Sequence, residues 1–269
     1  MTGLLKSNKR YRYIMKLRTI TIAAAIITGI LAPVRAATWE DLARPIAYLS
    51  AEAVPVPALP RPVICVDPGH PNTYNAATNT INGTNENHIN WVVALKLEKI
   101  LKENNFDVVM TRNAEMHYVE NKDRARLCNN SGAVLAVHLH CESTPGSGFA
   151  LYYPDRTGTY DFNNDPENGF KGPSAQVITQ SRATAAAIQK GMQAKLAGVL
   201  PSQGLYGDSR TLVGSNQGAL TFSIFSQIPT VTIEMVVLTN KTDAAFIKSD
   251  DSQQKMAQAI AAGIALAAQ

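Results

Sequence analysis

From residue 61 onward, short apolar segments alternate with segments of helical periodicity, and this order strongly restricts the fold. Strands are predicted in "PVICVDP", "FDVVM", "AVLAVHLH", "GFALYY" and "TVTIEMVVL". Helices are predicted over residues 86–103, 120–132, 175–200 and 252–269. The alternation predicts an α/β fold, a three-layer sandwich in which helices flank a mostly parallel central sheet of about six strands. In such folds a ligand site lies beyond the carboxyl ends of the strands.

The N-terminal segment carries the pattern of an export signal. Six lysines and arginines precede an apolar run over residues 20–31, and Val34-Arg35-Ala36 ends in a small residue. Residues 1–36 are therefore predicted to be a secretory signal peptide, with an uncleaved anchor as the alternative. Residues 37–60, punctuated by proline, are predicted to be a linker, and 61–269 a single catalytic domain. The expected location is the periplasm or cell envelope, or outside the cell.

The charge of the chain without its predicted signal peptide limits the kinds of partner that we expect. The predicted signal peptide holds seven of the 25 basic residues, so the remaining chain has 18 basic and 21 acidic residues, a formal charge of −3. We therefore expect no nucleic-acid partner, and no transmembrane span after signal cleavage.

Three cysteines leave at least one unpaired. Cys65 is predicted to be a buried thiol, and pairing of Cys128 with Cys141 is left open.

Four residues with metal or acid–base chemistry lie near the predicted strand ends. His70 follows the first strand, Glu86 begins the first helix, and His138 and Glu234 end later strands. Two imidazoles and one carboxylate with an open fourth position form the ligand set of a hydrolytic zinc site. A further carboxylate is then the natural general base. Each residue also has a purely structural alternative. His70 could cap a turn, and Glu86 could be an acidic residue that the helix dipole stabilises at the N-terminus. Glu234 could pair with Arg112 or Arg124.

Two further residues are expected close to this site. His138 and His140 point to the same face of their strand, because side chains alternate along it. His140 is predicted to lie outside the ligand set, since a fourth protein ligand would close the metal. Asp67 either orients a ligand or forms the turn before Pro68, and we favour the turn.

Several ordered motifs resemble one enzyme family. "VICVDPGHP", "NENHINWVVALKLEKIL", "DRARLCN", "AVHLHCES" and "TVTIEMVVLTNKTDAAFI" resemble the zinc-dependent N-acetylmuramoyl-L-alanine amidases of bacterial cell walls. The resemblance implies zinc ligands at His70, Glu86 and His138, and a catalytic carboxylate at Glu234. It places the histidine of the family's Ser-Ile-His-x-Asn strand on His138 and the asparagine on His140. Pro71 in place of glycine, and "MVV" in place of the family's Thr-Gly-Phe, are departures.

The implied reaction is hydrolysis of the amide bond between N-acetylmuramic acid and L-alanine in peptidoglycan by a zinc-activated water. Cell-wall remodelling or cell separation is the expected role, and a protein activator is left open as a partner. Two alternatives remain: a catalytically silent peptidoglycan-binding or regulatory module, and a zinc peptidase that acts on free peptides. The polar segment 155–174 is expected to be an insertion, either a lid or regulatory segment over the cleft or a passive loop.

Overall fold

The computed structural model describes residues 60–268. The predicted signal peptide, and all but the last residue of the predicted linker, lie outside the described residues. Between residues 60 and 268, no helix combines the length and the apolar character needed to cross a membrane.

A six-stranded sheet forms the centre of the fold and confirms the predicted architecture. Its strands lie in the order β2-β1-β3-β8-β4-β7, and every neighbouring pair is parallel except β4 with β8. The bounds are β1 Val63–Pro68, β2 Asp107–Met110, β3 Ala133–Glu142, β4 Phe149–Tyr153, β7 Ser202–Gly207 and β8 Thr230–Val237. The edge strand β7 was not predicted, because "SQGLYG" has neither the apolar run nor the alternation of a typical strand.

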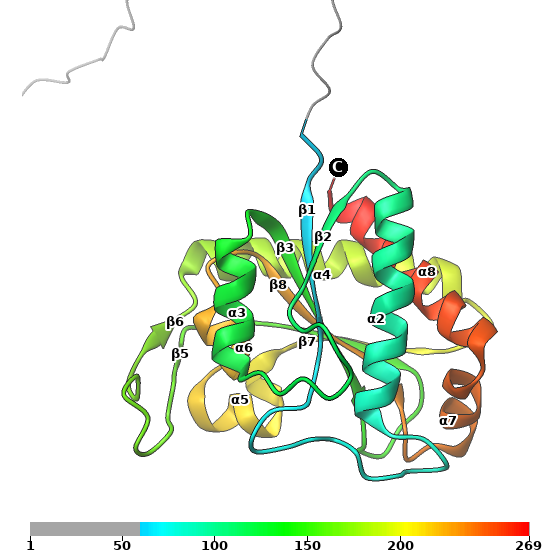
Figure 1. Cartoon of the computed structure of the whole chain (residues 1–269), viewed down its shortest axis with the longest axis horizontal. Coiled ribbons are helices and arrows are strands. Elements are labelled where there is room, and N and C mark those ends of the chain that lie inside the picture. The colour runs from blue at the N-terminus through cyan, green and yellow to red at the C-terminus, as the bar shows by residue number, and fades with distance from the viewer. Residues whose placement is uncertain (1–59, 269) are drawn as a thin grey trace, which may run out of the picture. The chain divides into compact units, whose positions relative to one another are not determined.

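Helices cover both faces of this sheet. Figure 1 shows α2 and α8 on one side, and α3 and α6 on the other. The bounds are α2 Glu86–Glu103, α3 Asn121–Asn130, α4 Ala175–Leu196, α6 Thr221–Phe225 and α8 Asp250–Ala267. The larger core joins α2, α4 and α8 to the sheet, whereas a smaller core lies beneath α3 and α6. The short elements are β5 Gly158–Thr159, β6 Lys171–Gly172, η1 Asp208–Arg210, α5 Leu212–Gln217 and α7 Lys241–Lys248.

Strand alternation separates apolar from polar side chains in β3. Leu135, Val137 and Leu139 belong to the larger core. His138 and His140 therefore point to the opposite face, toward α3 and α6. In the sheet register His138 lies between Asp67 and Thr232, and His140 lies beside Glu234. The polar groups of three neighbouring strands thus meet on one face of the sheet.

The insertion 155–174 packs against α3. It contains the β5–β6 pair, and Tyr160 within it is buried against Phe225. Lys122 on α3 forms ion pairs with Asp165, at 2.5 Å, and with Glu167, at 3.2 Å. These contacts hold the segment on the α3 side of the molecule.

The cysteine prediction for Cys65 is wrong. Cys65 on β1 forms a disulfide with Cys128 on α3, where the two Cα atoms are 5.5 Å apart. Cys141 is the buried free thiol. The reason is strand alternation, since Cys65 faces α3 whereas Cys141 joins the larger core on the opposite face.

A buried arginine joins α3 to the end of β1. Arg124 has no exposed surface, and its Nη1 donates to Asp67 Oδ1 and to the carbonyl of Pro68, each at 2.8 Å. Its Nε and Nη2 donate to the carbonyls of Val119 and Pro71. Burial alone would raise the pKa of Asp67, but the charges of Arg124 and His138 hold that pKa well below its usual range.

Loss of this arginine is expected to destabilise the fold severely. Arg124→Met should reduce the free energy of unfolding by about 3–5 kcal/mol, because it leaves Asp67 buried without its charged partner. Arg126→Met, on the exposed side of the same helix, is the matched control and should cost about 1 kcal/mol or less. Urea unfolding of both variants checks this. Equal losses would contradict the importance assigned to the buried pair.

Candidate functional site

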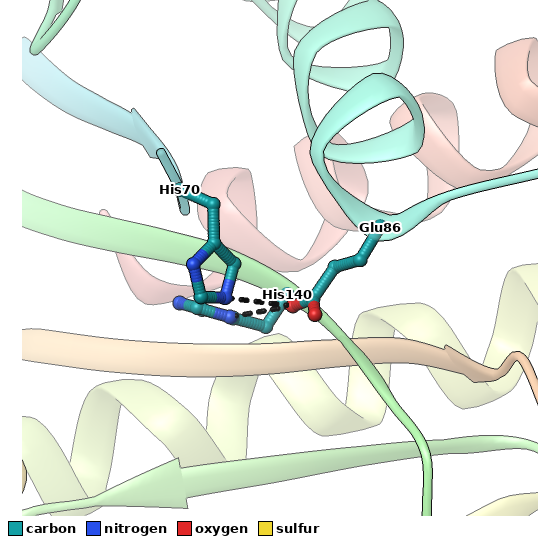
Figure 2. A group of neighbouring side chains, drawn as sticks. All are labelled: His70, Glu86 and His140. Atoms are coloured by element: carbon teal, nitrogen blue, oxygen red, sulfur yellow. Dashed lines mark hydrogen bonds and ion pairs between the residues drawn. The ribbon is translucent and has the colours of Figure 1, made fainter. Parts of the chain in front are cut away.

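Three side chains from three elements converge on one point. His70 follows β1, Glu86 is the first residue of α2, and His140 lies on β3, as Figure 2 shows. The potential ligand atoms of these residues all lie within 4.8 Å of one another. Glu86 Oε1 is 2.7 Å from His140 Nδ1 and 3.4 Å from His70 Nε2. One carboxylate oxygen of Glu86 therefore contacts both imidazoles, which lie next to each other.

Local backbone structure positions these groups. Gly69 lies against β3, and its N–H donates to the carbonyl of Leu139. A Cβ at residue 69 would overlap the ring of His140 and this carbonyl, so the close approach requires glycine. His70 has a φ of 59°, which lies in the left-handed region. The chain therefore leaves the extended conformation of β1 at this residue. Asn85 caps α2 by accepting from the N–H of His88, which fixes the helix start at Glu86.

The protonation states of these residues suit a cation. Burial alone would raise the pKa of Glu86, but hydrogen bonds and charge interactions with His140 and His70 lower it well below its usual range. Burial, together with the charge of His138, lowers the pKa of His140 to about 4, so this imidazole is neutral at pH 7. The carbonyl of Asn75 lies 3.2 Å from His70 Nδ1 and is placed to accept an N–H from it. A proton at Nδ1 leaves Nε2, on the Glu86 side of the ring, as the nitrogen that can bind a cation.

This donor set fits a divalent metal ion. A carboxylate oxygen and two imidazole nitrogens lie close together, and all three are ligand atoms that zinc accepts. Three protein ligands leave a fourth position open, as in catalytic rather than structural zinc sites.

Glu234 lies directly beside this group. It faces His140 across the β3–β8 register, and its Oε2 is shielded from solvent with no hydrogen-bond partner among the described residues. Burial, with the charges of Glu86 and Glu142, raises the pKa of Glu234 well above its usual value. The alternative pairing with Arg112 or Arg124 is not seen, because both guanidinium groups bind backbone carbonyls near β1. A carboxylate in this environment is suited to proton transfer.

The structure places His140, and not His138, in the group with His70 and Glu86. Sequence analysis assigned these two histidines the opposite way. Both point to the same sheet face, and each follows an apolar residue, so the motif fits in two registers. With the motif's histidine on His140, its isoleucine falls on Leu139 and its serine on His138. The correction shifts the motif by two residues along the strand.

Asp67 also differs from its predicted role. It lies inside β1 and is fully buried, so the favoured turn interpretation is wrong. Its Oδ2 accepts the N–H of His138 Nδ1, and its Oδ1 accepts from Thr111 and Arg124. The other interpretation, in which Asp67 orients a histidine, agrees with this geometry.

A cleft of about 660 Å³ opens onto the four ionisable groups His70, His138, His140 and Glu234. Aromatic side chains form much of its wall: Tyr74, Tyr152, Tyr160, Phe162 and Phe222. Sequence analysis did not identify these aromatic residues, although the insertion that supplies Tyr160 and Phe162 was recognised. Arg210 and Lys122 add positive charge to the lining. The cleft is large enough for a peptide or sugar segment.

Two curated proteins are similar to this chain in sequence. A curated N-acetylmuramoyl-L-alanine amidase of Mycobacterium tuberculosis is 26% identical over 228 residues, covering 76% of this chain and 85% of the relative. A sporulation-specific N-acetylmuramoyl-L-alanine amidase of Bacillus subtilis is 35% identical over 95 residues, covering 34% of this chain and 36% of the relative.

Solved structures share the fold. An N-acetylmuramyl-L-alanine amidase of Mycobacterium abscessus superposes with a TM-score of 0.60 at 21% identity, covering 78% of this chain and 100% of that one. An N-acetylmuramoyl-L-alanine amidase of Nostoc punctiforme has a TM-score of 0.59 at 19% identity, covering 76% of this chain and 95% of that one. The family model described as N-acetylmuramoyl-L-alanine amidase matches residues 64–266, which include every site residue named above. The chain therefore belongs to the N-acetylmuramoyl-L-alanine amidase family.

Proposed function

We propose that this chain is a zinc-dependent hydrolase that cleaves the amide bond between N-acetylmuramic acid and L-alanine in peptidoglycan. His70, Glu86 and His140 would hold the ion, and Glu234 would act as general base and acid. The observation that carries the proposal is the convergence of three potential metal ligands, His70, Glu86 and His140, beside the buried carboxylate of Glu234. A cleft lined by His70, His140 and Glu234 opens at this point. Family membership supplies the substrate class.

The residues divide the reaction between them. A zinc ion bound there would polarise the scissile carbonyl and acidify the attacking water. Glu234 takes a proton from that water and returns it to the amine nitrogen when the C–N bond breaks. The oxygen of the water remains in the new carboxylate of the lactyl group. The raised pKa of Glu234 favours holding the proton between these two steps.

The same proposal assigns a location outside the cytoplasm. Peptidoglycan lies there, the curated relatives are N-acetylmuramoyl-L-alanine amidases by name, and the N-terminal sequence has a predicted signal peptide. A role in wall remodelling or cell separation follows from the bond that is cut. A protein activator is an additional proposal that a reconstituted digestion would test.

Glu234→Gln is expected to abolish amide cleavage while leaving metal binding intact. The amide keeps the shape of the side chain but cannot take a proton, and general base catalysis contributes about 10²–10⁴-fold. Release of peptides from purified peptidoglycan, with zinc content measured on the same sample, checks this. Glu115→Gln, an exposed carboxylate paired with His88, should retain wild-type activity. Full activity in Glu234→Gln would remove Glu234 from the mechanism.

Metal removal should abolish activity reversibly. Chelation of the wild-type protein is expected to stop peptide release, and added Zn²⁺ should restore it. His140→Ala should lose stoichiometric zinc, whereas His88→Ala, an exposed histidine of α2, should retain it. Elemental analysis after gel filtration provides the measurement. Undiminished activity in chelated, zinc-free protein would contradict the proposed cofactor.

The products separate the alternatives. An amidase leaves intact glycan strands and free stem peptides that begin with L-alanine, and mass spectrometry of the digest is expected to find both. Free stem peptides that are added to the digest and recovered cut would instead indicate a peptidase that acts on free peptides. An unchanged digest from zinc-loaded protein would indicate a silent binding or regulatory module.

A further inference from the structure

A chain of hydrogen-bonding groups leads from His140 into the interior, away from the proposed metal. His140 Nε2 lies 2.7 Å from His138 Nε2. His138 Nδ1 meets Asp67 Oδ2, and Asp67 Oδ1 accepts from Thr111 and from Arg124. Asp67 and Arg124 have no exposed surface, and His138 is only 3% exposed. Water therefore does not compete for these contacts.

The proton positions along this chain follow from its buried end. Asp67 is a carboxylate, because its pKa is held well below the usual range, so it can only accept. His138 Nδ1 therefore carries a proton and donates it to Asp67. Without an ion, His140 Nδ1 donates to the carboxylate of Glu86 at 2.7 Å. With an ion on Nδ1, the N–H of His140 is on Nε2, where it faces His138 Nε2 at 2.7 Å.

We propose that His138, held by Asp67, is a positioning residue that fixes the tautomer and ring orientation of His140 and so strengthens zinc binding. The proposal rests on the function proposed above, in which His140 is a ligand. Ligating histidines in general donate their second ring N–H to a group that orients them. Here an imidazole does this, and a carboxylate buried in β1 in turn orients that imidazole.

Packing supports a positioning role. The ring of His138 stacks on Phe222 of α6, with centroids 4.7 Å apart and an interplanar angle of 15°. This contact and Asp67 fix the ring from two sides. The ring of His70 is held less firmly, because its Nδ1 contacts only the exposed backbone carbonyl of Asn75. The two imidazoles of the site are thus oriented by different means.

Zinc affinity of the full chain, measured by competition with a chelator of known affinity, tests the proposal. His138→Ala should bind Zn²⁺ about 10–100-fold more weakly than wild type, the usual effect of losing such a partner. His138→Gln, whose amide oxygen can accept from His140 Nε2, should recover part of this loss. His88→Ala, at an exposed histidine of α2 outside this chain of groups, is the control and should leave the affinity unchanged. Circular dichroism of each variant confirms that it is folded.

A second measurement reads the proton positions in the zinc-loaded site. In zinc-loaded protein labelled with ¹⁵N, correlation spectra of the imidazole rings should find His138 protonated at Nδ1 and His140 at Nε2. In His138→Ala the Nε2–H of His140 should lose its partner and exchange faster with water. In the zinc-loaded wild type, a proton on His138 Nε2, or none on His140 Nε2, would overturn the proposal.

The outcomes distinguish failure of this inference from failure of the proposed function. Absence of zinc binding in wild type would overturn the proposed function and the inference with it. Zinc binding in wild type that is unchanged in His138→Ala would overturn only the positioning role. A complete loss in His138→Ala, equal to that in His140→Ala, would make His138 a ligand and also overturn the positioning role.

Discussion

The buried carboxylate of Asp67 is the interaction on which the rest of the site depends. A charge in the centre of a sheet is costly unless charged and polar partners surround it. Arg124 from α3, Thr111 after β2 and His138 from β3 provide those partners. The same contacts join β1, β3 and α3 at the point where His70 leaves the sheet. The stability of the fold and the geometry of the proposed metal site therefore depend on one network.

The sheet keeps this polar network apart from its main core. One face is apolar and packs against α2, α4 and α8, whereas the other carries Asp67, His138, His140 and Glu234. Glu86 reaches the polar groups from the start of α2, where the Asn85 side chain caps the helix and the packing of α2 on the core sets its position. Side chains that line the cleft can therefore be substituted without disturbing the main core.

The fold and much of the candidate site could be predicted from the sequence. Both depend on patterns among residues close together in the chain, namely strand alternation and helical periodicity. Helix α2 was predicted with the bounds it has, and His70, Glu86 and Glu234 were chosen for their places at strand and helix ends. The two histidines of β3 could not be ordered, since side-chain alternation gives both the same face. Distinguishing them requires the distance to Glu86, which depends on how α2 packs. The Cys65–Cys128 disulfide and strand β7 likewise depend on tertiary packing.

Anomalous diffraction at the zinc absorption edge, from crystals of the zinc-loaded protein, tests the central claim most directly. The account predicts one strong peak within bonding distance of His70 Nε2, a Glu86 carboxylate oxygen and His140 Nδ1, with His138 hydrogen-bonded to the far side of His140. A peak bonded to His138 in place of His140, or no peak near Glu86, would contradict it.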